Sequence, residues 1–136
     1  MGNIGYKMTE DEVVSHLQRH FEDKGWNVKC CKESERGIDI DASKGDKRVI
    51  MEAKGAMAGE MYKKRKHFDG GQITTHFGKA IVKILKAKIE DKNAEFAIAH
   101  PDDALIKKHI GNLIPFLKDL EIPHYWVSQT GEVTKS

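Results

Sequence analysis

The chain has little of several features that define protein classes. It contains only two cysteines in 136 residues, and these are neighbours, Cys30 and Cys31. Adjacent cysteines have a poor spacing for a zinc site and are not expected to form a structural disulfide, so a reducing cytoplasm fits. No stretch approaches the ~20 apolar residues of a membrane-spanning helix, and the start, MGNIGYKMTE, lacks the apolar segment of a secretory signal. The sequence therefore predicts a cytoplasmic protein with no membrane partner.

The chain also lacks a strong charge of either sign. Its 23 Lys and Arg against 21 Asp and Glu leave a net charge of +2, which is too small to indicate nucleic-acid binding by itself. Any attraction to phosphate must come from local clusters of cations. A Gly-rich phosphate loop, a Gly-x-Ser-x-Gly nucleophile and a Cys-x-x-Cys pair are absent as well. The length suits one ordinary domain, expected over residues 9–136 after a tail at 1–8.

The most informative segment runs from Arg36 to Gly55, RGIDIDASKGDKRVIMEAKG. A period of two along its first half places apolar side chains on one face of a strand and carboxylates on the other. Gly45-Asp46 has turn chemistry, and the apolar run Val49-Ile50-Met51 suits a second, buried strand. The segment therefore predicts a hairpin whose first strand alternates as follows: Ile38, Ile40 and Ala42 on the apolar face, and Asp39 and Asp41 on the other.

Two charged side chains, Glu52 and Lys54, directly follow the buried strand. They lie two residues apart and so face the same side, where burial is costly unless they are paired or bind an ion. Asp39 and Glu52 are hard oxygen ligands of the kind that Mg²⁺ prefers, with Mn²⁺ as a substitute. A metal-held water attacks a phosphodiester, and Lys54 would position that water or stabilise charge in the transition state. The pattern thus predicts a site for metal-dependent phosphodiester hydrolysis.

A simpler interpretation of the same residues is an ion pair between Glu52 and Lys54 at the end of a strand. Glu-x-Lys is weak evidence alone, because it also occurs at Glu22–Lys24 and Glu90–Lys92, where polar helix ends explain it. Only the copy at Glu52 ends a strand and follows a Gly-Ile-Asp strand. That context favours the catalytic interpretation.

This combination resembles the PD-(D/E)xK nuclease superfamily, whose members have the restriction-endonuclease-like fold. The resemblance rests on Gly37-Ile38-Asp39, on the strand ending in Glu52-Ala53-Lys54, and on the amphipathic helix before them. The chain is similar in particular to Mrr-like restriction enzymes and archaeal-type Holliday junction resolvases. The resemblance implies a DNA endonuclease in which Asp39, Glu52 and the backbone carbonyl of Ala53 bind the metal and Lys54 is the catalytic lysine. Ile38 stands where the family's name has proline, a position that varies among such nucleases.

The hydrophobic pattern of the whole chain predicts an α/β fold with a mixed central sheet flanked by helices. Thr9 and Glu12 form a capping box at the start of the first helix, which ends at Gly25. The expected order is helix, three strands, helix, strand, then further helix and a final strand. After the first helix the expected elements are a strand at 26–31, the hairpin, a helix from Asp69 or the Gly70-Gly71 pair, and a strand at 94–99. Asp102 and Asp103 then open a helical region that contains Leu105, Ile106 and Ile110, followed by a short helix at 114–120 and a last strand at 124–127.

The first helix offers a further candidate ligand. Glu10 precedes Val13, Val14 and Leu17 by three, four and seven residues, so it lies on the apolar face and is aimed toward the sheet. Resolvase-like relatives carry a glutamate at that place, which implies that Glu10 helps to bind the metal or to orient its waters. The alternative for Glu10 is an acid that is favourable at any helix N-terminus. Glu12 is the rival candidate, and the capping box explains it without catalysis.

The second helix carries two candidates for substrate contact, Gln72 and Lys79. Nucleases of this superfamily often begin this helix with a polar residue, commonly Gln. The resemblance therefore implies that Gln72 contacts a phosphate or a metal-bound water, reinforced by the helix N-terminal amides; a Gln facing solvent is the alternative. Lys79 lies on the same face and could extend the contact. Lys83, Lys86 and Lys88 add charge, a pattern that is also normal for an exposed helix face.

Four consecutive cations, Lys63-Lys64-Arg65-Lys66, precede that helix. Beside a phosphodiesterase site they suggest a contact with the DNA backbone. A solvated loop is the usual interpretation of such a run, and the neighbouring motif favours DNA contact.

Three functional interpretations follow from these features. The preferred one is a Mg²⁺-dependent DNA endonuclease in restriction, repair or recombination. The second is a non-catalytic nuclease-fold module that binds DNA or a protein, although binding alone does not require Asp39, Glu52 and Lys54 together. The third, a regulatory or structural α/β protein, leaves the basic run unexplained. Duplex, branched, single-stranded or modified DNA, and also RNA, are all compatible substrates. A homodimer is a further hypothesis, because many small relatives dimerise to cut two strands.

Overall fold

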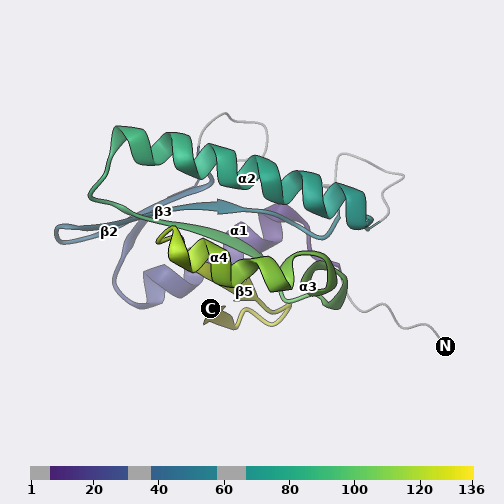
Figure 1. The fold of residues 1–136 in the computed structure, drawn as a ribbon. Helices are drawn as coiled ribbons and strands as arrows, with labels where there is room; N and C mark the ends of the chain where they lie inside the picture. The colour runs from purple at the N-terminus through teal and green to yellow at the C-terminus, as the bar shows by residue number, and fades with distance from the viewer. Residues whose placement is uncertain (1–6, 31–37, 58–66) are drawn as a thin grey trace.

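The computed structural model describes residues 7–30, 38–57 and 67–136 (Figure 1). Within these residues the centre is a six-stranded mixed sheet whose strands lie in sequence order. Strands β1 (Asn27–Cys30), β2 (Ile40–Lys44) and β3 (Lys47–Ala53) pair in antiparallel fashion, β1 with β2 and β2 with β3. Strands β3, β4 (Glu95–Pro101) and β5 (His124–Val127) are parallel, and β6 (Val133–Lys135) returns antiparallel to β5.

Helices cover both faces of this sheet, as Figure 1 shows for α1 on one side and α2 on the other. On one face, α1 (Glu10–Asp23) is the only helix among the residues that the structure describes. The opposite face carries α2 (Gly70–Glu90), α3 (Ala104–Ile110), the 3₁₀ turn η1 (Gly111–Leu113) and α4 (Ile114–Asp119). No helix of the described ranges is long and apolar enough to cross a membrane.

The alternation of side chains along β3 divides the core into two layers. Val49, Met51 and Ala53 pack against α1, whereas Ile50 packs against α2. Because successive side chains of a strand point to opposite faces, Glu52 lies on the α2 side with Ile50. The strand therefore sends a carboxylate into the layer between the sheet and α2.

The predicted starts of both long helices are confirmed. Thr9 and Glu12 form the capping box of α1, with the Glu12 amide donating to Thr9 Oγ1 at 3.3 Å. Asp69 is the N-cap of α2, where its carboxylate accepts a hydrogen bond from the Gln72 amide at 2.8 Å. In both cases a short polar side chain satisfies an amide that has no partner within the helix.

Two features of the sheet differ from the prediction. The strand His124–Val127 is not the last, because β6 follows it; the residues of β6 carry little apolar character, so no alternating pattern marks them. Strand β2 begins at Ile40, and Ile38 packs with the α2-side core rather than on the α1 side with Ile40 and Ala42. The period of two thus holds only from Ile40 onward.

The chain leaves β3 by passing close to the start of α1. The Ala56 amide donates to the Met8 carbonyl at 2.7 Å, and Met57 forms an isolated parallel bridge with Thr9. A Cβ added at Gly55 would lie 2.7 Å from the Thr9 carbonyl carbon, so only glycine fits between the two segments. This close approach ties the beginning of α1 to the end of β3, where the candidate site lies.

Candidate functional site

Asp39 and Glu52 face each other at one end of the β2–β3 hairpin. Ile40 pairs with Met51, so the preceding Asp39 lies opposite the following Glu52. Both are buried, with 6% of Asp39 and 2% of Glu52 exposed. The Ala53 amide donates to Asp39 Oδ2 at 2.8 Å, which fixes the Asp39 carboxylate against the end of β3. The structure therefore brings together the two carboxylates that the sequence marks as metal ligands.

The ionised form of Glu52 is disfavoured at this position. Burial, and then the negative charge of Asp39, raise the pKa of Glu52 to about 7, against the opposing effect of Lys83 and Lys54. Its Oε1 atom is buried and has no hydrogen-bond partner within the described part of the chain. A buried carboxylate in this state gains free energy from a nearby cation.

Two lysines approach Glu52, one from each side. The Nζ atom of Lys54 lies 3.8 Å from Oε2, and the Nζ atom of Lys83 lies 3.3 Å from Oε1. The Lys54 side chain is 18% exposed at the strand end, whereas the Lys83 side chain is 41% exposed on α2. The predicted ion pair between Glu52 and Lys54 is thus present as a long contact, and sequence reasoning missed the shorter one from Lys83.

The donor set at this point suits a hard divalent cation. Asp39 and Glu52 supply carboxylate oxygens, and the Ala53 carbonyl is available on the same edge. The Lys54 amide donates to the Ala99 carbonyl of β4. In a strand, the carbonyl of one residue points away from the amide of the next residue, so the Ala53 carbonyl points away from β4. The backbone of Ala53 therefore faces β2, as its amide bond to Asp39 indicates. Two carboxylates and one carbonyl leave room for the waters that Mg²⁺ keeps.

Glu10 does not complete a three-carboxylate group with this pair. Among residues 7–30, 38–57 and 67–136, no three His, Cys, Asp or Glu side chains lie together as a metal-holding cluster. Glu10 is half-buried at the first position of α1, near Gly55. Its role in orienting metal-bound waters stays a prediction.

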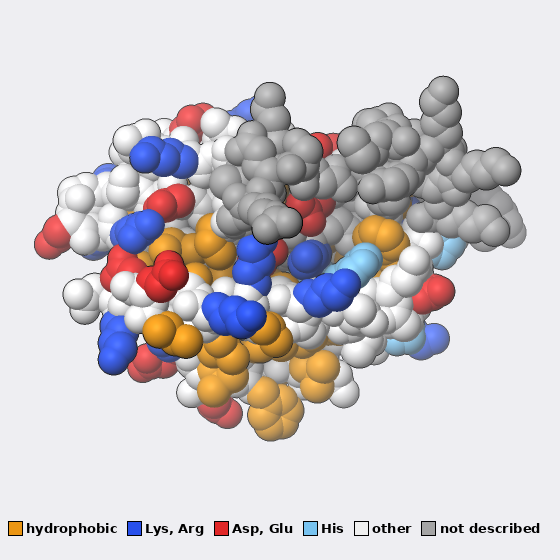
Figure 2. Space-filling model, turned by 90° about the horizontal axis from the view of Figure 1, so that it is seen from above, with side chains coloured by type: hydrophobic (Ala, Val, Ile, Leu, Met, Phe, Trp, Pro, Cys, Tyr) orange, Lys and Arg blue, Asp and Glu red, His pale blue; other side chains and the backbone are white. Residues whose placement is uncertain are grey.

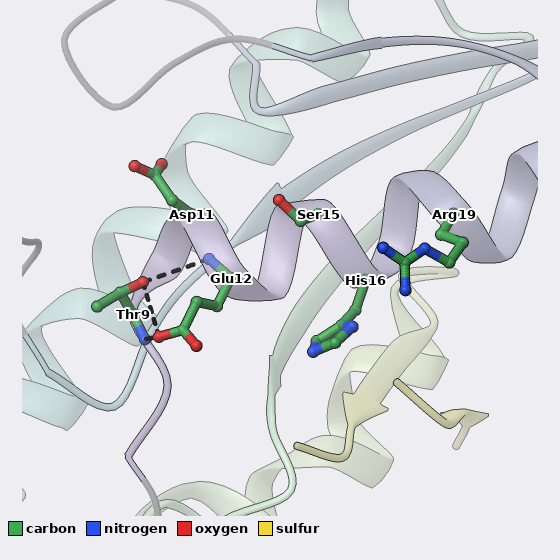
Figure 3. Close-up of a pocket in the computed structure, with 6 residues that line it drawn as sticks. All are labelled: Thr9, Asp11, Glu12, Ser15, His16 and Arg19. Atoms are coloured by element: carbon green, nitrogen blue, oxygen red, sulfur yellow. Dashed lines mark hydrogen bonds between the residues drawn. The ribbon is translucent and has the colours of Figure 1, made fainter. Parts of the chain in front are cut away.

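Glu12, the rival candidate, is held by the capping box (Figure 3). Its Oε1 atom accepts from the Thr9 amide at 3.1 Å and from Thr9 Oγ1 at 3.2 Å. With Ser15, His16 and Arg19 it lines a pocket along α1. The geometry thus gives Glu12 a structural task.

The α2 candidates lie on the exposed side of that helix. Gln72 Oε1 accepts from the Asp69 amide at 3.0 Å and so closes a second capping box. This contact explains Gln72 without substrate, and its predicted phosphate contact remains a prediction. Lys79 lies further along α2 in a surface groove whose lining is Thr74, Thr75, Gly78, Lys79, Val82, Lys83 and Lys86. The cations Lys63, Lys64, Arg65 and Lys66 lie outside the described residues.

A buried histidine pair lies beside Lys54. The register of β3 with β4 places His100 opposite Lys54, and His100 Nδ1 lies 2.8 Å from His124 Nε2. Burial lowers the pKa of His124 to about 3; burial, and then His124 and Lys54, hold the pKa of His100 well below its usual range. Both rings are therefore neutral at pH 7. Their outer atoms, His100 Nε2 and His124 Nδ1, have no hydrogen-bond partner within the described ranges.

Comparison with known proteins identifies this architecture in solved structures. No protein-family model and no curated protein matches the chain. The crystal structure of an XisH family protein from Nostoc punctiforme has a TM-score of 0.57 at 12% identity and covers 91% of this chain and 97% of that chain. An fdxN element excision controlling factor protein from Anabaena variabilis has a TM-score of 0.53 at 12% identity, over 91% of this chain and 96% of that chain.

The fold class is confirmed by these neighbours. The chain shares the mixed α/β architecture of the XisH family protein over 91% of its length. Identity of 12% supports the fold alone. The chemistry must therefore be argued from the site itself.

Proposed function

We propose that this chain is a metal-dependent phosphodiesterase that cleaves DNA internally, in restriction, repair or recombination. The observation that carries the proposal is the buried pair Asp39 and Glu52, with Glu52 Oε1 lacking a hydrogen bond and Lys54 beside it. Two adjacent buried carboxylates repel each other, so a purely structural role for them is unfavourable. A divalent cation removes that repulsion.

The proposed location is the cytoplasm.

Each residue has a defined task in this proposal. Asp39, Glu52 and the Ala53 carbonyl would hold Mg²⁺, or Mn²⁺ in its place, and the bound ion would supply a nucleophilic water and neutralise phosphate charge. The hydrogen bond from Ala53 keeps the Asp39 carboxylate in place before the ion arrives. Lys54 orients the attacking water or stabilises the charge that develops on the phosphate. His100 stands next to it as a neutral, buried residue, so it does not compete for the negative charge.

Nucleic acid is the proposed substrate because cations gather on the α2 side of the site. Seen from that side, Lys and Arg side chains lie along the middle of the molecule (Figure 2). Lys79, Lys83 and Lys86 line the same groove on α2, and lysine side chains are common partners of backbone phosphates. One solved neighbour is described as a controlling factor for excision of an fdxN element. That description concerns the neighbour, and it agrees with a nucleic-acid partner here.

The test is cleavage of end-labelled DNA by the purified chain. The panel holds duplex, single-stranded, flapped and four-way-junction DNA, each with Mg²⁺, Mn²⁺ or EDTA. We expect cleavage only with metal, and we expect Asp39→Asn to lower it by about 10²-fold or more because a ligand carboxylate is lost. Asp46→Asn, in the exposed hairpin turn, is the matched control and should cleave like the wild type. Metal-independent cleavage, or equal cleavage by both variants, would refute the proposal.

A second candidate function is a nuclease-fold module that binds DNA or a protein without cutting. The printed name of the Anabaena variabilis neighbour speaks of control rather than cleavage. Unchanged DNA binding by Asp39→Asn, with no cleavage by any protein on any substrate, would favour this alternative.

We also propose that two copies pair through an exposed apolar surface between α2 and α4. Monomers rarely expose several large apolar side chains together. A surface of this kind suits an isologous contact, in which the same patch of each copy meets the other across a twofold axis. The apolar members are Val82, Leu85, Ile89, Leu113, Phe116 and Leu120, with exposures of 52%, 41%, 75%, 40%, 66% and 49%.

Phe116→Glu should disrupt this dimer because it places a carboxylate among the exposed apolar side chains of this surface. Size-exclusion chromatography with light scattering should give about 31 kDa for the wild type, twice the chain mass of 15.4 kDa, and the single-chain mass for the variant. Lys108→Glu, on the exposed side of α3, tests for a general effect of charge and should remain dimeric. A monomeric wild type at high concentration would refute the dimer and leave the cleavage proposal untouched.

A further inference from the structure

One cation at the site comes from α2 rather than from the β2–β3 hairpin. Lys83 Nζ lies 3.3 Å from Glu52 Oε1, a shorter distance than the 3.8 Å between Lys54 Nζ and Glu52 Oε2. The same Oε1 atom has no partner with hydrogen-bond geometry in the described part of the chain. The contact between Lys83 and Glu52 is therefore an ion pair without a directed hydrogen bond. Another cation can readily replace the lysine in such a contact.

The Glu52 carboxylate needs a positive charge beside it, and in the protein without metal that charge must come from a side chain. The Glu52 side chain is only 3% exposed and lies across from the buried Asp39. Removing a carboxylate from water without a partner is costly, and a second carboxylate beside it adds repulsion. The ammonium of Lys83 offsets both effects in the protein without metal.

We propose that Lys83 is a built-in counter-ion that holds Glu52 until a divalent cation displaces it, and that the freed ammonium then binds a phosphate of the nucleic acid. This inference rests on the proposed function, because it assigns the divalent cation to Asp39 and Glu52. It adds Lys83 to the site and specifies that metal binding precedes the contact between Lys83 and a phosphate. In this scheme the site exchanges one cation for another and is not left with two unpaired carboxylates.

The exposure of Lys83 makes this exchange possible. Its side chain is 41% exposed, against 18% for Lys54, so it has space to rotate away from Glu52. Lysine carries its charge on four flexible methylenes, which suits a movable counter-ion. Lys83 also lines the α2 groove together with Lys79 and Lys86. An ammonium released from Glu52 therefore enters a surface that already carries cations for phosphate.

Metal affinity is the first test. Calorimetric titration with Mn²⁺ should show that Lys83→Met binds the ion about fivefold more tightly than the wild type, because the ion no longer displaces an ammonium. Lys92→Met removes the same charge from an exposed position just after the end of α2; it is the matched control for general electrostatics and should change the affinity less than twofold. Equal or weaker binding by Lys83→Met would overturn the inference while wild-type binding still supports the metal site. An absence of Mn²⁺ binding in every protein would instead refute the proposed function.

DNA binding is the second test and addresses the released ammonium. Fluorescence anisotropy with labelled duplex and four-way-junction DNA is measured in EDTA and in Ca²⁺, a hard cation that takes the same oxygen ligands. We expect Lys83→Met to weaken binding about fivefold in Ca²⁺ and less than twofold in EDTA, where Glu52 retains the lysine in the wild type. A loss that is equal in both conditions would mean a permanent phosphate contact, and an absence of loss would mean none; either result would overturn the exchange. Circular dichroism spectra should match for all variants.

Discussion

Replacing Lys54 with methionine is expected to lower the rate of DNA cleavage at saturating metal by about 10³-fold. Methionine keeps the length of the side chain and its packing but removes the ammonium. The Lys54 side chain lies at the end of β3 with its Nζ atom 3.8 Å from Glu52 Oε2, so its ammonium stands beside the proposed metal ligands. The loss should appear in the single-turnover rate constant, with the Mn²⁺ and DNA affinities each changed by only a few-fold.

The control for Lys54 is Lys47→Met, at the exposed first position of the same strand. It removes the same charge from the same strand and should leave the rate within twofold. A reduction of less than about fivefold in Lys54→Met would mean that Lys54 is a structural partner of Glu52. A large loss of metal affinity together with the rate would place its effect on the ligands rather than on the transition state.

The hairpin was predictable because its information is local. The alternation from Ile40 to Ala42, the turn at Gly45-Asp46 and the apolar run to Met51 together determine the register of β2 on β3. That register alone places Asp39 opposite Glu52. The two capping boxes are local in the same sense, because each satisfies amides within one helical turn.

The contact from Lys83 could not be read from the sequence. Lys83 is one of several lysines on α2, and only the packing of α2 against β3 selects it as the partner of Glu52. Its residue type does not distinguish it from Lys79 or Lys86. A weak signal was available in the helical register, since Ala80 and Ile84 are buried and Lys83 lies between them. Such a lysine needs an acceptor near the sheet.

The histidine pair was hidden for a related reason. His100 ends one strand and His124 begins another, and each alone is typical of a strand end. Their contact depends on β4 and β5 being parallel neighbours, in the register Ile98 with His124. Long-range strand order is not encoded in any single segment. The pair is nevertheless important for stability, because two imidazoles are buried without charge.

The histidines make the folded state sensitive to acid. In the folded protein the pKa of His124 is about 3 and that of His100 is well below 6.5, whereas in the unfolded chain both titrate near ~6.5. The unfolded state therefore binds more protons below that pH, and stability present above pH 6.5 is lost as the pH falls. Each proton contributes about 1.4 kcal/mol per pH unit.

Glu52 has the opposite effect in the same range of pH. Its pKa is raised from 4.5 to about 7 in the folded protein, so the folded state binds the extra proton between these values. Its contribution to stability is fully present below pH 4.5 and is lost as the pH rises through 7. In the protein without metal, protonation of Glu52 on acidification thus offsets part of the loss caused by the two histidines.

Glu52→Gln should therefore make the protein more sensitive to acid while it removes a buried charge. Urea unfolding in EDTA at pH 6 and pH 5 should give a loss of roughly 1 kcal/mol for the wild type and about twice that for the variant, since one opposing proton is gone. All other titrating groups are shared, so the difference between the two slopes reports the Glu52 carboxyl together with its coupling to Asp39. Glu95→Gln, which removes an exposed carboxylate at the start of β4, should keep the wild-type slope. Identical slopes for Glu52→Gln and the wild type would mean that Glu52 is already ionised at pH 6, with Lys83 and Lys54 sufficient to stabilise its charge.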